Sequence, residues 1–175
     1  MKIFLVRNGE TTGDIEDRYG GSYDDHLTDL GREQLVATAN NLVDKGIEII
    51  LTSPLIRAKE SAEIISLRIE CSAEIMNGLE ERGYGVLGGL TKAEALEKYP
   101  EVVEAHKDPP NTDPEGESYD DFRNRVLETF QKITKKEYNT IAVVSHGGPI
   151  KQILAHLGEN IPEKIGDGGI IEVNI

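Results

Sequence analysis

Short apolar runs rich in β-branched residues alternate with longer stretches that have apolar residues at helical spacing. This alternation is typical of a mostly parallel sheet with helices on both faces. We therefore predict an α/β fold, a three-layer α/β/α sandwich with a mostly parallel sheet and an inserted cap-like segment. The predicted strands are Lys2 to Val6, Ile47 to Thr52, Ser72 to Met76, Asn139 to Ser145 and Ile170 to Asn174.

Capping residues mark where the helices should begin and end. Thr28 is the expected N-cap of a helix that Gly46 should end, because a side-chain oxygen caps the first turn and glycine tolerates the conformation after the last. Its apolar positions are Leu30, Leu35, Ala39 and Leu42. Further starts are expected at Ser53-Pro54, at Thr91 with Glu94 and at Ser118 with Asp121.

The stretch 77–117 breaks this pattern. It is rich in glycine and proline and is expected to be an insertion over the sheet, where loops form one wall of a cleft. The length of 175 residues suits one domain, so we expect a single domain that carries this insertion.

Composition narrows the partners. The chain has 19 Lys and Arg against 32 Asp and Glu, a net charge of −13. Such a surface repels nucleic acids and anionic membranes, so an anionic ligand has to be small and held by a local basic pocket. The chain has a lone cysteine, Cys71, and no signal-peptide pattern, and none of its apolar segments approaches the roughly 20 residues of a spanning helix. These features predict a cytoplasmic protein.

Two predicted strands run directly into turns suited to binding an anion. The first leads into Arg7-Asn8-Gly9-Glu10-Thr11 and the fourth into Ser145-His146-Gly147-Gly148. Arg57 follows the second strand by about one helical turn. Arginine offers a planar fork to phosphate oxygens, and ligands bind at the carboxyl edge of open α/β sheets. These positions indicate a phosphate site.

The motifs resemble the histidine phosphatase superfamily, also called the phosphoglycerate mutase-like family, over nearly the whole chain. The family's first turn reads Arg-His-Gly-Glu, and its second strand leads into Thr-Ser-Pro-Leu-x-Arg-Ala. The resemblance implies that Arg7 and Arg57 bind phosphate, that His146 contacts it, and that Gly147 offers its backbone N–H. The family pattern Leu-x-Glu places the general acid at Glu81, with neighbouring Glu80 as the alternative.

The chain departs from the family pattern at two positions. Asn8 stands where the nucleophilic histidine should be, and an amide nitrogen with a delocalised lone pair cannot form a phosphoramidate. Asp14 replaces an Asn that commonly helps bind phosphate, and its carboxylate would repel the ligand unless protonated or turned away. The presence of Asn8 has two explanations. One is an engineered replacement or a recent single loss of the histidine, and the other is a natural pseudoenzyme. Retention of the other site residues favours the first.

Three functions follow as hypotheses. The first is a phosphatase for small phosphomonoesters that works through a phosphohistidine and is inactive as written. The second is a 2,3-bisphosphoglycerate-dependent phosphoglycerate mutase, in which Arg82, Tyr84 and Lys92 would help hold a phosphorylated three-carbon acid; the short insertion favours the phosphatase. The third is a non-catalytic phosphate-ligand sensor or interaction module. The expected partner is a small phosphorylated metabolite or inorganic phosphate, with no nucleic acid and no membrane, and a homodimer stays open. No metal or other cofactor is implied.

Overall fold

A mostly parallel five-stranded sheet forms the centre of the computed structural model, which describes residues 1–108 and 110–175. The strand order is β3-β2-β4-β1-β5, and only β5 runs antiparallel, against β1. The bounds are β1 Lys2–Arg7, β2 Ile49–Thr52, β3 Ala73–Ile75, β4 Thr140–Ser145 and β5 Ile170–Asn174. The α/β class and all five predicted strands are confirmed.

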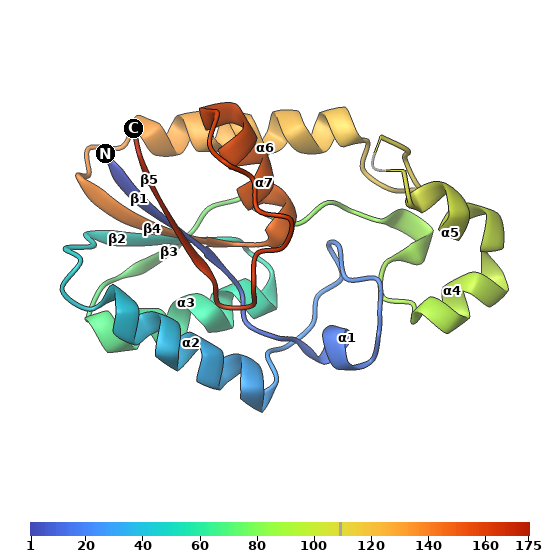
Figure 1. Ribbon diagram of the computed structural model, residues 1–175, viewed down its shortest axis with the longest axis horizontal. Helices are drawn as coiled ribbons and strands as arrows, with labels where there is room; N and C mark the ends of the chain where they lie inside the picture. Colours follow the sequence, from blue (N-terminus) through green and yellow to red (C-terminus); the bar gives the residue numbers. More distant parts are fainter. Residues whose placement is uncertain (109) are drawn as a thin grey trace.

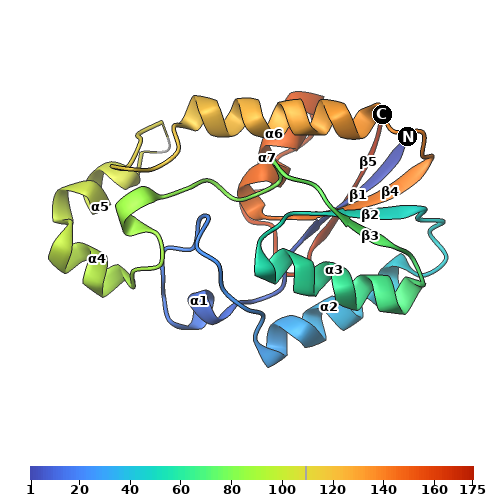
Figure 2. The same ribbon diagram turned by 180° about the vertical axis from the view of Figure 1, so that it is seen from behind.

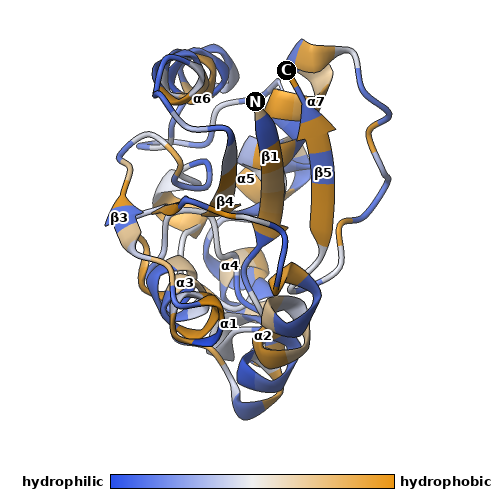
Figure 3. Ribbon diagram, turned by 90° about the vertical axis from the view of Figure 1, so that its left-hand side faces the viewer, coloured by the Kyte–Doolittle hydropathy of each residue, from blue (hydrophilic) through white to orange (hydrophobic). Residues whose placement is uncertain are grey.

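Helices cover the sheet on both faces (Figure 1). On one face lie α2 (Asp29–Leu42) and α3 (Ile56–Ile69), and on the other lie α6 (Tyr119–Thr134) and α7 (Gly147–Leu157). Coloured by hydropathy, the strands stand between these two layers as a largely apolar slab (Figure 3). The three-layer arrangement predicted from the sequence is therefore present.

Alternate residues of the three central strands, β2, β4 and β1, enter two separate cores, which is the reason why these strands are continuous apolar runs. In β1, Ile3 and Leu5 pack on the α6 and α7 side, whereas Phe4 and Val6 pack on the α2 and α3 side. All four are buried. The three central strands are thus fixed from both faces, and their ends form a rigid platform for the residues that follow.

Most of the predicted helix starts are confirmed. Thr28 caps α2, Ser118 caps α6, and Thr91 with Glu94 forms a reciprocal capping box at α4 (Lys92–Lys98). The predicted end of α2 at Gly46 is wrong, because the helix ends at Leu42. Leu30 is also half exposed and contributes nothing to the core.

Glycine at position 31 explains how α2 sits against the first turn. A Cβ at Gly31 would lie 2.1 Å from the backbone oxygen of Glu10. The helix therefore approaches this turn through its first-turn glycine rather than through Leu30. The buried face of α2 consists of Gly31, Leu35, Thr38, Ala39 and Leu42.

The predicted helix start at Ser53-Pro54 is wrong. Helix α3 begins at Ile56, its N-cap residue is Leu55, and no side chain caps it. The Ser53 hydroxyl, which was expected to cap this helix, lies instead within hydrogen-bonding distance of His146. A residue predicted to have a structural role thus belongs to the candidate site.

Residues 77–117 extend beyond the end of the sheet (Figure 2). They contain the 3₁₀ turn η1 (Gly85–Leu87), α4 and α5 (Pro100–His106), while the short helix α1 (Thr12–Ile15) follows the first turn. Residue 109 of this segment lies outside the described residues. The assignment of the segment as an insertion into a single domain stays a prediction. Within the part of the chain that is described, no helix has the length and apolar character needed to cross a membrane.

Candidate active site

Three adjacent strands deliver the centre of the site. Asn8, His146 and Ser53 are the first residues after β1, β4 and β2, which neighbour one another in the sheet. The backbone N–H of Asn8 donates to the oxygen of Ser145 (3.0 Å), and that of Ser53 donates to the oxygen of Val144 (3.0 Å). The ladder therefore continues one residue past the strands and fixes the backbone at these positions.

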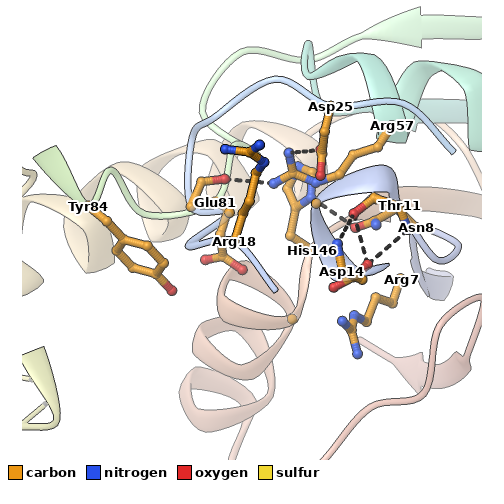
Figure 4. A pocket seen from close by; sticks show the side chains of 14 residues that line it. Arg7, Asn8, Thr11, Asp14, Arg18, Asp25, Arg57, Glu81, Tyr84 and His146 are labelled. Atoms are coloured by element: carbon orange, nitrogen blue, oxygen red, sulfur yellow. Dashed lines mark hydrogen bonds and ion pairs between the residues drawn. The ribbon is translucent and has the colours of Figure 1, made fainter. Parts of the chain in front are cut away.

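Asn8 and His146 line a cavity of about 160 Å³, and Ser53 lies behind them as a partner of His146. Figure 4 shows its labelled side chains converging from β1, the first turn, α3, the loop after β3 and the start of α7. The cavity is lined by Arg7, Asn8, Thr11, Gly13, Asp14, Arg18, Gly20, Gly21, Asp25, Arg57, Glu81, Tyr84, His146 and Gly147.

His146 is held from both ring nitrogens. Nδ1 lies 3.0 Å from Oδ1 of Asn8, and Nε2 lies 2.8 Å from Oγ of Ser53. The Asn8 amide nitrogen donates to the backbone oxygen of Gly9 (2.9 Å), so its Oδ1 is left as the acceptor. His146 must then donate from Nδ1, and neutral imidazole accepts the Ser53 hydroxyl proton at Nε2.

Burial keeps this imidazole neutral. His146 is 2% exposed, and its pKa is lowered well below the ordinary 6.5, first by burial and then by the positive charges of Arg57, Arg7 and Arg125. A neutral ring in a fixed tautomer is the form that the hydrogen bonds with Asn8 and Ser53 require. The hydrogen bonds and the lowered pKa therefore both indicate that His146 is neutral.

This assignment predicts the titration of His146 directly. Nitrogen chemical shifts from NMR should show the Nδ1–H tautomer at neutral pH and no protonation through the ordinary histidine range around 6.5. Protonation of His146 within this range would contradict its buried, doubly hydrogen-bonded state.

Arg57 is anchored by the loop before α2. Its guanidinium pairs with Asp25 (2.9 Å) and donates to the backbone oxygens of Tyr23 (2.6 Å) and Gly21 (2.7 Å). The side chains of Arg57 and Asp25 are only 7% and 4% exposed. The structure therefore brings Arg57 to the cavity, as expected, but its guanidinium is already paired with the Asp25 carboxylate.

Arg7 is also paired within the protein. It forms an ion pair with Asp167 (2.9 Å) and donates to the backbone oxygen of Ile165, both in the loop before β5. The ion pair is partly exposed, with 22% of the Arg7 side chain accessible. Solvent weakens such a pair, so an incoming anion can compete for Arg7 more easily than for Arg57.

Glu81 joins the loop after β3 to the start of α7. Its Oε2 accepts the backbone N–H of Gly148 (2.8 Å), and its Oε1 accepts that of Arg82 (2.9 Å). A Cβ at position 148 would lie 2.0 Å from Oε1, so glycine is needed for this approach. The carboxyl is thus fixed at the edge of the cavity.

Asp14 also lines the cavity, and its carboxylate is used locally. Oδ2 accepts the backbone N–H and the hydroxyl of Thr11, both at 2.8 Å, in the capping box of α1. One oxygen is therefore turned toward the first turn of its own helix. This arrangement reduces the expected repulsion between the Asp14 carboxylate and a phosphate ligand only in part, because Asp14 still lines the cavity.

Two predicted ligands lie outside the cavity. Arg82 lines a neighbouring cavity, and Lys92 is exposed at the start of α4, where it pairs with Asp17 (2.6 Å). Lys92 therefore does not line this cavity, and its predicted part in holding a phosphorylated three-carbon acid stays a prediction. Glu80, the alternative acid, pairs with Arg125.

Sequence reasoning missed several residues at the site. Thr11 ends the first turn and Arg18 follows it, and the sequence assigned neither of them a role of its own. Asp25 gave no signal of its own and Ser53 was expected only to cap a helix, since each acts through a partner distant in sequence. Among the described lining residues, three guanidinium groups thus face three carboxylates, and His146 adds no charge.

Comparison with known proteins gives a consistent picture. Residues 3–170 match the sequence model of the histidine phosphatase superfamily (branch 1). Phosphoserine phosphatase 1 of Hydrogenobacter thermophilus is 32% identical over 167 residues, 90% of this chain and 76% of that protein. The 2,3-bisphosphoglycerate-dependent phosphoglycerate mutase of Cytophaga hutchinsonii is 28% identical over 170 residues, 93% and 80% of the two chains.

The fold comparison agrees. The structure of Bacillus stearothermophilus YhfR superposes with a TM-score of 0.89 at 26% identity, covering 99% of this chain and 91% of that one. The chain spans 43% of the length of three mycobacterial relatives that are 35% identical, among them the bifunctional protein Rv2228c of Mycobacterium tuberculosis.

Proposed function

Because the chain belongs to the histidine phosphatase superfamily, we propose that its site is built to receive the phosphoryl group of a small phosphomonoester, with Asn8 at the position of the nucleophile. Phosphatase relatives such as the Hydrogenobacter enzyme support the hydrolytic class. In this proposal the chain as written binds the ester and does not turn it over.

One observation carries the proposal. Asn8 and His146 are in contact at the ends of β1 and β4, and two arginines reach the same cavity from β1 and α3. The N-terminus of α7 opens beside them at Gly147, and a helix start favours an anion. These groups could surround the oxygens of one phosphate.

The mechanism assigns one step to each group. A histidine at position 8 attacks phosphorus and forms a P–N bond while the P–O bond to the leaving group breaks. A proton from Glu81 goes to the departing oxygen. Water then attacks phosphorus, the P–N bond to the histidine breaks, and one proton of the water returns to the Glu81 carboxylate as phosphate is released. The arginines balance the charge on the equatorial oxygens in both steps. Asn8 cannot take the first step.

Turnover by an Asn8→His variant, without added metal, tests the proposal. A phosphate-ligand sensor is the second candidate, and one observation favours it: with Asn8 in place, both nitrogens of His146 are already hydrogen-bonded. Retained ligand affinity without turnover in the variant would support the sensor. A mutase needs a bisphosphorylated primer and further cationic ligands, and the position of Lys92 does not favour it.

Arg7 should contribute to anion binding. Arg7→Ala should weaken the binding of inorganic phosphate by about 1.5 kcal/mol, the value of a charge-assisted hydrogen bond. Isothermal titration calorimetry measures the change. Arg68→Ala is the control, because Arg68 lies in the last turn of α3 with Asn40 as its partner. Equal affinity in wild type and Arg7→Ala would place the anion site elsewhere.

Glu81 should matter for the leaving group and not for the phosphate. In the Asn8→His background, Glu81→Gln should slow hydrolysis of an alkyl ester by roughly 10² or more, because a poor leaving group needs a proton. An activated aryl ester should lose much less. Both rates are measured in one preparation near neutral pH, with phosphate affinity as the control. Equal losses for the two esters would show that Glu81 only positions the substrate.

A further inference from the structure

A second cavity adjoins the phosphate cavity and shares Glu81 and Tyr84 with it. Its volume is about 280 Å³. In Figure 4, Tyr84 stands on one side of Glu81 while His146 and Asn8 stand on the other. The second cavity is lined by Glu81, Arg82, Tyr84, His106, Tyr119, Phe122, Gly148, Lys151 and Gln152.

From this arrangement we propose that the second cavity is the leaving-group subsite, and that it selects phosphomonoesters whose leaving group is a flat, apolar ring bearing a carboxylate. The inference rests on the proposed function and names its substrate class. Glu81 stands at the boundary between the two cavities, where the P–O bond would break. The phosphoryl group would then lie on one side of this carboxyl and the alcohol on the other.

Aromatic side chains give the cavity its preference for a flat body. The Tyr84 ring packs edge-on against His106 with centroids 4.6 Å apart, which fixes one wall. Tyr119 and Phe122, from the first turn of α6, form another, and Phe122 is buried. Such rings favour offset or edge contacts with another aromatic ring.

Cationic and polar groups at the other walls give a preference for an anion. The Arg82 guanidinium lies 5.8 Å from the centre of the Tyr119 ring, and its hydrogen bonds include those to the backbone oxygens of Asn111 and Glu117. Lys151 donates to the backbone oxygen of Glu163 (2.7 Å). The acceptor of Lys151 is a neutral backbone oxygen, which does not cancel a positive charge as a carboxylate would.

Gln152 completes this side. Its amide nitrogen donates to the Tyr119 hydroxyl (3.1 Å), and it reaches the cavity from α7, one residue after Lys151. In a chain with a net charge of −13, two cations beside one carboxylate make a locally positive pocket. A carboxylate on the ligand would be attracted there, whereas an ammonium group would be repelled.

The volume limits the size of the leaving group. A cavity of about 150 Å³ accommodates one benzene ring. A cavity of about 280 Å³ therefore has room for one ring with a single small substituent. Esters with extended or branched leaving groups would have to project into solvent.

Equilibrium binding to the full chain with Asn8 tests the subsite without turnover. Calorimetry compares 4-carboxyphenyl phosphate with 4-carbamoylphenyl phosphate, its neutral counterpart, and phenyl phosphate with methyl phosphate, with inorganic phosphate as the reference. The acid should bind at least about tenfold more tightly than the amide, as expected for a hydrogen bond to a charged group. Phenyl phosphate should bind about tenfold more tightly than methyl phosphate, because its ring is buried in the cavity.

Lys151→Met should reduce the preference for the acid to less than about threefold and leave the affinity for inorganic phosphate unchanged. Lys132→Met, on the exposed face of α6, is the matched control and should keep the preference. Thermal unfolding confirms that both variants fold.

Four outcomes decide the matter. Loss of the acid preference in Lys151→Met alone supports the subsite. Equal binding of acid and amide, or of phenyl and methyl phosphate, while inorganic phosphate still binds, would overturn the subsite and leave the proposed function standing. A preference for the acid that Lys151→Met does not change would also overturn it. Failure of inorganic phosphate and of every ester to bind would overturn the proposed function and the subsite together.

Discussion

The chain with Asn8 should show no measurable phosphatase activity, and Asn8→His should convert it into a working phosphatase. Loss of the nucleophile in a hydrolase that uses covalent catalysis costs roughly 10⁶ in kcat, so the gain should be on the order of 10⁵ or more. Release of phosphate from a small ester, measured for both proteins without added metal, gives the ratio directly.

The physical reason is local. The backbone of position 8 is already fixed, because β1 ends one residue before it and the backbone N–H of Asn8 extends the ladder to β4. The amide oxygen of Asn8 accepts a hydrogen bond from His146, and its amide nitrogen donates one to the backbone oxygen of Gly9. An imidazole there supplies a nucleophilic nitrogen and removes the acceptor that fixes the His146 tautomer.

Asn8→Gln is the control, since it keeps an amide and adds only length. It should stay inactive while Asn8→His gains activity. Equal turnover by the wild-type chain and Asn8→His would remove position 8 from the chemistry. Activity in Asn8→Gln would point to a contaminating enzyme or to another nucleophile.

The sequence was sufficient for the parts of the fold that depend on local pattern. Apolar runs located all five strands, and they are clearest in β1, β2 and β4, which are buried on both faces. Cap residues located the starts of α2, α4 and α6. The end of α2 could not be read in this way, because Gly46 stands four residues beyond Leu42 and the chain leaves the helix earlier.

The candidate site could be predicted only as far as strand ends reveal it. Arg7, Asn8 and His146 follow strands in the sequence, and the parallel sheet necessarily brings such positions to one edge. The partners of these residues were not predictable, since Asp167 lies 160 positions from Arg7 and Ser53 lies 93 positions from His146. No periodicity encodes a contact between two loops, so only the structure shows that the carboxylates of Asp25 and Asp167 pair with Arg57 and Arg7.

The ion pair between Asp25 and Arg57 leads to a second large effect. Asp25→Ala should lower the free energy of unfolding by about 3 kcal/mol, because removal of one partner leaves a buried charge uncompensated. The backbone oxygens of Gly21 and Tyr23 stay bonded to Arg57 and keep the loss near the lower end of the range for such pairs. Urea unfolding at neutral pH measures the change.

Lys92→Met provides the matched comparison. It breaks the ion pair with Asp17, whose two side chains are 57% and 68% exposed, and should cost less than about 1 kcal/mol. Equal losses in the two variants would mean that burial does not distinguish the pairs. The comparison also checks Lys92 itself, since a residue outside the phosphate cavity should leave phosphate affinity unchanged.

Anion binding should change in the opposite direction to stability. In the wild-type chain Asp25 supplies the negative charge that Arg57 would otherwise take from a ligand, and it sits in a cavity that already contains Asp14 and Glu81. Asp25→Ala removes one carboxylate and releases one guanidinium, so inorganic phosphate should bind more tightly and should stabilise the variant more than the wild type at equal concentration. Unfolding curves with and without phosphate measure both effects in one experiment. If phosphate stabilised the variant less than the wild type, Arg57 would be a structural residue that holds the loop before α2, and Arg7 with the start of α7 would remain as the anion site.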